Sequence, residues 1–475
     1  MHYSSLLTDL YQLTMLAGYF DEDMAEKEAL FDLYFRINPF EGAYAVFAGL
    51  ETALDFLEKL QFSEEELSFL TELNYFKPSF IDYLRGFRFH GKVHAPREGS
   101  LVFANEPLLT VEGTLAEVQF VETALLNIIN FQTLTATKAA RICHAANGAE
   151  VFEFGLRRAQ GPDGGLSVSR AAYVGGCKGT SNVLAGKMFG LPLRGTQAHS
   201  WIQAFPDELT SFRAYADSFP LSTVLLVDTY DTLKSGIPNA ITVAKDLRAQ
   251  GHELRGIRID SGDLAYLSRE ARRMLDKAGF TGVKIVVSND MDEYVIESVR
   301  NEGGLVDIYG IGTRLATCAG DGGGALGGVY KLVEIAGEPK LKVTGDIAKS
   351  TLPGKKKVLR FVDQCGDFIQ DVVCLDSELI QGGDTVYDPY NPLRFTTLPP
   401  DAQMTELRGV VMSEGRCCTP SESLDAIAER CKNEISKLPS GCLRLINPHR
   451  YKVSISERLK NLRGSLIEEL GKRME

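Results

Sequence analysis

The sequence predicts an α/β protein built around an irregular (β/α) barrel, with an N-terminal α+β domain and a smaller C-terminal region. Short apolar runs begin at residues 151, 171, 191, 223, 255, 283 and 306, and helical patterns separate the later ones. No dinucleotide-binding glycine fingerprint follows any of these runs, which favours a barrel over an open Rossmann sheet.

The N-terminal domain is expected over residues 1–130. Leucines at helical spacing near residue 50 and an alternating stretch over 90–111 that is broken by glycine and proline indicate helices mixed with short strands. A long amphipathic helix is expected over 118–146, where the pair Asn147-Gly148 supplies a stop signal.

The barrel is expected over residues 131–328, with strands at 151–154, 171–174, 191–193, 223–227, 255–259, 283–287 and 306–308. Helices are expected over 241–250 and 264–278. The C-terminal region, 329–475, is expected to pack on the N-terminal domain, to open with a hairpin over 329–335 and 340–344, and to end in a helix from about residue 456.

Composition excludes several functional classes. The 475 residues carry 51 Lys and Arg against 63 Asp and Glu, so the net charge of −12 argues against nucleic acid as a partner. Apolar stretches are too short to span a membrane, and the first residues do not resemble a secretory signal. The nine cysteines form no CxxC pair, which argues against a zinc ribbon and fits a reducing cytoplasm.

Candidate functional residues follow the expected strands, where a barrel carries its active site. Glycines and arginines at these positions suit a small, multiply anionic ligand, and aspartates suit Mg²⁺ held mainly through water and substrate phosphates. Structural alternatives stay open at this point: Arg157 and Arg158 fit a surface pair, Asp260 fits a helix N-cap, and His199 fits a core histidine.

At these residues the sequence resembles the nicotinate phosphoribosyltransferases. The motifs that carry the resemblance are TDLYQLTM (8–15), FGLRRAQGPDGG (154–165), GTQAHS (195–200), VDTY (227–230), RIDSGDL (258–264), GIGT (310–313), GVYKL (328–332) and TLPG (351–354). The resemblance implies an irregular barrel of the type II phosphoribosyltransferase kind. It also implies transfer of phosphoribosyl from phosphoribosyl pyrophosphate to nicotinate, giving nicotinate mononucleotide and pyrophosphate in NAD salvage.

By this resemblance, ATP and Mg²⁺ take part, and ATP drives the reaction through a phosphohistidine at His199. Asp228 and Asp260 are expected to stabilise the charge that develops on the ribose. The resemblance places nicotinate against Tyr11, Thr196, Arg258 and Arg157, and phosphoribosyl pyrophosphate against Thr313. Gly312, Lys178 and Arg314 are further candidates for binding its phosphates, and Arg314 is a departure, since some relatives carry serine there. No site of protein ligands for a resident metal is expected.

The resemblance further implies a homodimer with shared active sites, in which Tyr11 serves the site of the partner. Two alternatives remain at the level of sequence. One is a nicotinamide phosphoribosyltransferase of the same fold, which Arg258 beside Thr196 disfavours because an amide needs both a donor and an acceptor. The other is a non-catalytic barrel that binds nicotinate or phosphate, which the retention of His199 disfavours.

Overall fold

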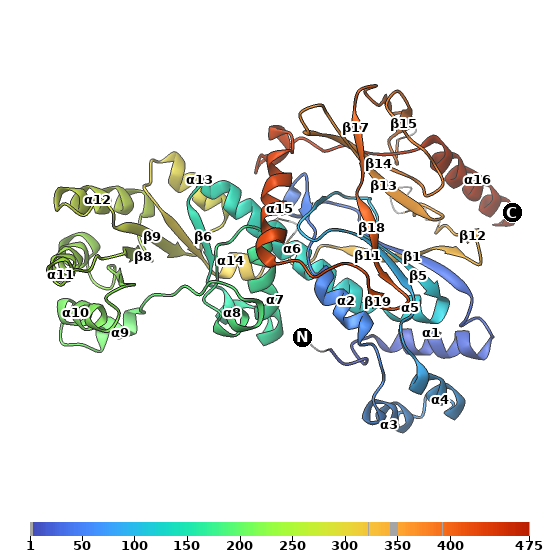
Figure 1. Cartoon of the computed structure of the whole chain (residues 1–475), viewed down its shortest axis with the longest axis horizontal. Helices are drawn as coiled ribbons and strands as arrows, with labels where there is room; N and C mark the ends of the chain where they lie inside the picture. The colour runs from blue at the N-terminus through green and yellow to red at the C-terminus, as the bar shows by residue number, and fades with distance from the viewer. Residues whose placement is uncertain (1–2, 322, 343–349, 392, 475) are drawn as a thin grey trace. The chain divides into compact units, whose positions relative to one another are not determined.

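The computed structural model describes residues 3–321, 323–342, 350–391 and 393–474 (Figure 1). The chain forms two compact units, one comprising Met1–Leu134 with Ala325–Glu475 and the other comprising Thr135–Gly324. In the described residues, no helix is both long enough and apolar enough to cross a membrane. The domain boundaries expected at residues 130 and 328 stay a prediction.

The first unit contains a seven-stranded antiparallel sheet that joins the two ends of the chain. Its order is β12-β11-β1-β5-β3-β18-β19. The strands are β1 (Glu28–Phe35), β3 (Lys92–Pro96), β5 (Leu109–Thr114), β11 (Gly328–Ile335), β12 (Glu338–Pro339), β18 (Arg408–Ser413) and β19 (Arg416–Cys417). The expected hairpin is present as β11 and β12, but its second strand lies at Glu338–Pro339, within the residues that were expected to connect the two strands. Residues 340–342, expected in that strand, form none, and residues 343 and 344 lie outside the described residues. A small separate pair is formed by β2 (Ala45–Val46) and β4 (Leu101–Val102).

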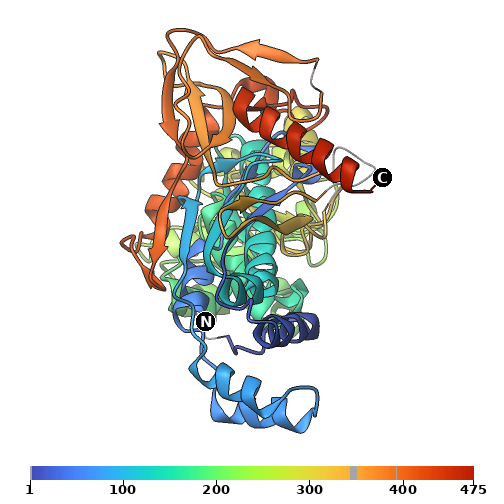
Figure 2. The ribbon, with the colours of Figure 1, turned by 90° about the vertical axis from the view of Figure 1, so that its right-hand side faces the viewer.

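Six helices accompany the N-terminal strands. They are α1 (Leu10–Asp21), α2 (Leu50–Glu58), α3 (Glu64–Glu72), α4 (Pro78–Gly86), α5 (Leu115–Phe120) and α6 (Glu122–Ala146). Helix α3 begins with a capping box, in which Ser63 and Glu66 bond each other's backbone N–H groups, and it lies beside α4 (Figure 2). The expected long helix is present as α5 and α6, and both Asn147 and Gly148 adopt positive φ where it ends.

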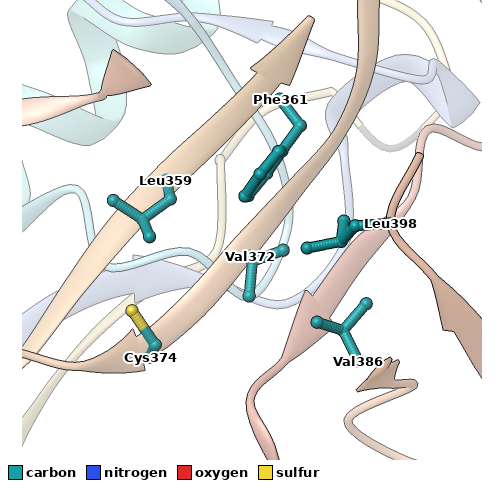
Figure 3. Packing of buried hydrophobic residues seen from close by; sticks show 6 residues of the cluster. All are labelled: Leu359, Phe361, Val372, Cys374, Val386 and Leu398. Atoms are coloured by element: carbon teal, nitrogen blue, oxygen red, sulfur yellow. The ribbon is translucent and has the colours of Figure 1, made fainter. Parts of the chain in front are cut away.

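A second sheet of the same unit is built from the C-terminal region, in the order β16-β15-β20-β14-β13-β17. Its strands are β13 (Lys356–Val362), β14 (Phe368–Leu375), β15 (Thr385–Tyr387), β16 (Phe395–Thr397), β17 (Gln403–Glu406) and β20 (Val453–Ile455). Alternate residues of β13 and β14 point to one face and form a buried cluster with Val386 and Leu398 (Figure 3). Helix α16 (Glu457–Met474) contacts β14 and β15, which confirms the expected terminal helix, and α15 (Leu424–Ser436) precedes it.

The second unit is organised by a parallel sheet in the order β6-β10-β9-β8-β7. The strands are β6 (Glu150–Glu153), β7 (Val224–Leu226), β8 (Gly256–Ile259), β9 (Lys284–Asn289) and β10 (Ile308–Ile311). Beyond β6, two isolated parallel bridges continue the sheet, from Glu153 to Thr180 and from Thr180 to Leu193. The expected parallel βα architecture is confirmed, with two of its seven strand positions reduced to single bridges.

One expected strand is wrong. Residues 171–174 form the last turn of helix α7 (Gly161–Val174), in which Val168, Ala171 and Ala172 are buried. A short apolar run has the same composition in a buried helix as in a buried strand, so its length alone did not distinguish the two. The position in the sheet is taken by Thr180 instead.

The other helices of this unit lie between successive strand positions of the sheet, except that the last one follows β10. They are α8 (Val183–Phe189), α9 (His199–Gln203), α10 (Glu208–Ser218), α11 (Ile237–Ala249), α12 (Leu264–Lys277), α13 (Glu293–Asn301) and the short α14 (Thr313–Ala316). Helices α11 and α12 confirm the two that the sequence predicts over 241–250 and 264–278. Because every strand of this sheet is parallel, the carboxyl ends of the strands share one edge.

Candidate active site

The functional side chains come from alternate positions along neighbouring strands. In β8 the positions 256 and 258 share one face, and Asp260 directly follows the strand; in β9 the positions 284, 286 and 288 share the same face. The intervening residues Ile257, Ile285 and Val287 are fully buried on the opposite face. The period of the strand therefore brings Arg258, Asp260 and Ser288 together at the carboxyl edge of the sheet.

Arg258 is held on three sides. Its Nε donates to Ser288 Oγ at 2.7 Å, its Nη1 donates to Thr196 Oγ1 at 2.9 Å, and its Nη2 lies 3.1 Å from Asp260 Oδ2. The Arg258 side chain is 15% exposed, so the guanidinium is fixed by the protein and still reachable. A guanidinium has five N–H donors, which leaves some of them for a ligand.

Two aspartates lie next to each other beside this arginine. Asp228, which follows β7, accepts from the backbone N–H of Asp260 at 2.9 Å and from Ser261 Oγ at 2.6 Å, both through Oδ2. The N-cap of α12 is Asp263, which accepts from the N–H of Tyr266. Asp260 and Ser261 are thus not needed as the cap, and the alternative structural interpretation of Asp260 does not apply.

His199 is the first residue of α9 and is brought to the same edge. Its Nδ1 lies 3.0 Å from Thr229 Oγ1, and its Nε2 lies 3.8 Å from Asp260 Oδ2. The side chain is 40% exposed, which is incompatible with the alternative of a core histidine. Asp260 therefore lies between His199 and Arg258.

Two buried polar groups at this site have no hydrogen-bond partner among the described residues. Asp228 Oδ1 is one, and the side-chain amide of Gln197, which is 5% exposed, is the other. Unpaired polar atoms that are shielded from water cost free energy, and they commonly mark positions that a ligand, an ion or ordered water satisfies. Both residues directly adjoin the Arg258 network, through Asp260 and Thr196.

A cavity of about 970 Å³ lies along the same face of the sheet, away from the carboxyl edge. Thr196 lines this cavity, so it reaches the Arg258 network. The volume lies within the range of small-molecule sites, and the apolar part of the lining suits a flat ring. The sheet residues that line it are the apolar Phe152, Val224, Gly256, Val286 and Ile308 and the charged Glu150 and Lys284.

The expected phosphate-binding segment, Gly310 to Thr313, comprises the end of β10 and the start of α14. Gly310 packs against the ring of Phe154, where a Cβ atom would lie 2.6 Å from the ring carbons. Gly312 and Thr313 begin α14, which contacts the short helix Leu156–Arg158. The structure thereby places exposed Arg157 near Gly312 and Thr313, and the described contacts do not join Arg157 to Arg258.

Two expected site residues of this unit make their contacts outside this network, and a third belongs to the other unit. Arg314 pairs with Asp290 and Asp292 at 3.3 and 3.4 Å. The backbone N–H of Lys178 bonds Val151 O, two residues before the end of β6, and its side chain is exposed. Tyr11 lies on α1 in the other compact unit and is 47% exposed.

The sequence interpretation missed a buried carboxylate at the end of β6. Glu153 is fully buried and accepts from Ser169 Oγ at 3.0 Å, from Thr180 Oγ1 at 2.5 Å and from the backbone N–H of Gly155. It thus fixes the turn that leads to Arg157. Ser288, Thr229 and Gln197 were also missed, although each adjoins an expected site residue or a strand end.

Comparison with known proteins is consistent along the whole chain. The model of the nicotinate phosphoribosyltransferase N-terminal domain matches residues 6–130, that of the nicotinate phosphoribosyltransferase family matches 149–370, and that of the C-terminal domain matches 355–463. The nicotinate phosphoribosyltransferase of Bacillus subtilis (strain 168) is 42% identical over 480 residues, which cover 99% of this chain and 96% of that protein. That of Homo sapiens is 36% identical over 521 residues, which cover 97% and 96%.

Solved structures agree with this result. Human nicotinic acid phosphoribosyltransferase superposes with a TM-score of 0.87 at 35% identity, covering 97% of this chain and all of that one. A nicotinate-nucleotide pyrophosphorylase from Pyrococcus furiosus shares the fold, with a TM-score of 0.71 at 24% identity over 91% and 95% of the two chains. The expected type II phosphoribosyltransferase fold class is confirmed, and the chain belongs to the nicotinate phosphoribosyltransferase family.

Proposed function

We propose that this chain transfers phosphoribosyl from phosphoribosyl pyrophosphate to nicotinate, coupled to ATP hydrolysis, giving nicotinate mononucleotide and pyrophosphate. The observation that carries the proposal is the fixed, reachable guanidinium of Arg258, which Thr196 connects to a cavity with a partly apolar lining. A planar guanidinium matches a carboxylate with two parallel hydrogen bonds, and the cavity accepts a pyridine ring.

Arg258 and Thr196 favour nicotinate over nicotinamide. The remaining guanidinium N–H groups are donors only, so they match both carboxylate oxygens of nicotinate but leave the NH₂ group of an amide facing a cation. Thr196 Oγ1 accepts from Arg258 Nη1 at 2.9 Å and donates its own proton to the backbone carbonyl oxygen of Gln197 at 3.3 Å, so Thr196 fixes the direction of the guanidinium.

Asp228 and Asp260 suit the proposed transition state. As the bond from the ribose C1 to pyrophosphate breaks, positive charge develops on the sugar, and carboxylates held nearby stabilise it without reorganising. Both are held: Asp228 Oδ2 accepts two hydrogen bonds, and Asp260 is fixed between Arg258 and His199.

The donor set also fits Mg²⁺. Among the described residues, no group of three or more His, Cys, Asp or Glu residues could hold a metal ion. Asp228 Oδ1 is a buried oxygen with no partner, and Mg²⁺ prefers such hard donors with water and phosphate oxygens completing its octahedron. When bound, the ion would neutralise pyrophosphate charge, and Asp228 is the residue that would hold it.

His199 is proposed to accept the terminal phosphoryl group of ATP. Its ring is 40% exposed and is oriented by Thr229, which supports a nucleophilic role. Phosphorylation adds negative charge and acceptor oxygens beside the departing pyrophosphate. Gly312 and Thr313 are proposed to bind phosphates, as are Lys178 and Arg314, although the last two lie apart from the network. The resemblance assigns Arg157 to nicotinate; because its short helix contacts α14, we propose that it binds phosphate instead.

Tyr11 is proposed to serve the active site of a second copy in a homodimer. Its support is the exposed apolar surface of α1, on which Leu10, Tyr11 and Met15 are 49%, 47% and 36% exposed. The resemblance assigns Tyr11 the role of stacking on the pyridine ring.

Steady-state kinetics with nicotinate and nicotinamide, each with and without ATP, test the proposal. The expected result is a kcat/KM for nicotinate at least about 100-fold above that for nicotinamide, raised further by ATP. Comparable values for the two bases would favour a nicotinamide phosphoribosyltransferase. Binding of nicotinate without pyrophosphate release would favour a non-catalytic barrel.

A further inference from the structure

Ser288 lies where it can fix the orientation of the Arg258 guanidinium relative to the Asp260 carboxylate. It lies at the end of β9, is 5% exposed and faces the same side of the sheet as Val286. Its hydroxyl oxygen accepts from Arg258 Nε at 2.7 Å and donates to Asp260 Oδ1 at 2.5 Å. A serine hydroxyl has one proton, so that proton is committed to the aspartate.

These bonds close a ring on one edge of the guanidinium. Ser288 Oγ accepts from Arg258 Nε, and Asp260 Oδ2 lies 3.1 Å from Arg258 Nη2. The Ser288 hydroxyl in turn donates to Asp260 Oδ1. The Nε/Nη2 edge is one of the two edges through which arginine binds a carboxylate with two parallel bonds. Since it is occupied, an incoming carboxylate is left with the Nη1/Nη2 edge, next to Thr196.

We propose that Ser288 is a positioning residue that directs nicotinate to the Nη1/Nη2 edge of Arg258. The inference rests on the proposed function. Without the hydroxyl, Arg258 Nε and Asp260 Oδ1 lose the partner that they share. The guanidinium plane is then no longer fixed relative to the Asp260 carboxylate, and the Nη1/Nη2 edge loses the orientation in which it meets the substrate carboxylate.

The test is a comparison of Ser288→Ala with Ser288→Thr and a matched control. We expect Ser288→Ala to raise the KM for nicotinate about 10- to 100-fold, the effect of one hydrogen bond to a charged group, and to change the KM for phosphoribosyl pyrophosphate less than about twofold. Ser288→Thr keeps the hydroxyl, so its KM for nicotinate should lie close to the wild-type value. Ser211→Ala, which removes a fully buried hydroxyl on α10, should leave both constants unchanged.

Other outcomes are decisive as well. An unchanged KM for nicotinate in Ser288→Ala, or equal rises for both substrates, overturns the inference while leaving the proposed function intact. If Ser288→Ala does not fold, Ser288→Cys, which keeps the volume with a weaker hydrogen-bonding group, should show the same selective rise. A wild-type chain that neither binds nor converts nicotinate overturns the proposed function, and the inference with it.

Discussion

Replacing Arg258 tests the proposed base site most severely. Arg258→Ala removes the guanidinium from a position that is 15% exposed and leaves Thr196 and Ser288 without their donor. It also removes the positive charge that separates Asp260 and Asp228 from the carboxylate of the substrate. The loss should therefore fall on nicotinate, the ligand whose charge Arg258 is proposed to meet.

The magnitude follows from the bonds that are lost. A hydrogen bond to a charged group contributes about 1.5–3 kcal/mol, and two such bonds to nicotinate are replaced in part by water. We expect a net loss of about 3 kcal/mol, or roughly a 100-fold rise in the KM for nicotinate. Arg258→Lys keeps the charge without the planar fork, so it should recover only part of the loss.

The assay is initial-rate kinetics with each substrate varied in turn, supported by calorimetric titration of nicotinate. Arg213→Ala is the matched control, because it removes an arginine from an exposed ion pair with Asp246 in the same unit. Equal effects of Arg258→Ala on both substrates would move Arg258 to the phosphate site. No effect on either would refute the assignment altogether.

Three further predictions concern catalysis and stability. His199→Ala should keep the fold and some phosphoribosyl transfer in the absence of ATP, but it should lose both the stimulation of that transfer by ATP and labelling of the protein by the terminal phosphate of ATP. Undiminished stimulation by ATP would remove His199 from the mechanism. Gly236→Ala should lower the unfolding temperature by several degrees or prevent folding, because the added Cβ would lie 1.8 Å from the carbonyl oxygen of Val227. Gly282→Ala is the control, since its Cβ would meet no atom within 4 Å and should leave the unfolding temperature unchanged. Equal unfolding midpoints for the two variants would contradict this. Asp207 caps α10, and hydrogen bonds from the backbone N–H and then the hydroxyl of Thr210 lower its pKa. The stabilisation by the charged Asp207 is present above the ordinary pKa of 3.8 and is lost as the pH falls below that value. Wild type should therefore unfold at a higher temperature than Asp207→Ala near pH 6, and the two unfolding temperatures should converge in acid. A difference that does not change with pH would contradict the role of the charge.

The sequence anticipated the parts of the site that strand periodicity determines. Asp260 and Asp228 follow apolar runs that the structure confirms as β8 and β7, Arg258 lies near the end of β8, and parallel strands bring such positions to one edge. The expectation for residues 171–174 was wrong because a four-residue apolar run does not distinguish a helix from a strand.

The remaining parts depend on contacts between distant residues. Ser288 is 30 residues from Arg258 in the chain, and Thr229 is 30 residues from His199, so neither pair is visible as a local motif. Glu153 lies inside an apolar run, and its role as an acceptor is apparent only once Ser169 and Thr180 are brought beside it. Lys178 was expected at a strand end because the preceding run was taken as a strand.

The most direct measurement of the central claim is identification of the products. Purified chain is incubated with ring-labelled nicotinate, phosphoribosyl pyrophosphate, Mg²⁺ and ATP, and the products are separated by chromatography and quantified. We expect nicotinate mononucleotide and pyrophosphate in equal amounts, with product reduced at subsaturating nicotinate in Arg258→Ala. A folded wild-type chain that binds both substrates but forms no labelled nucleotide would contradict the account.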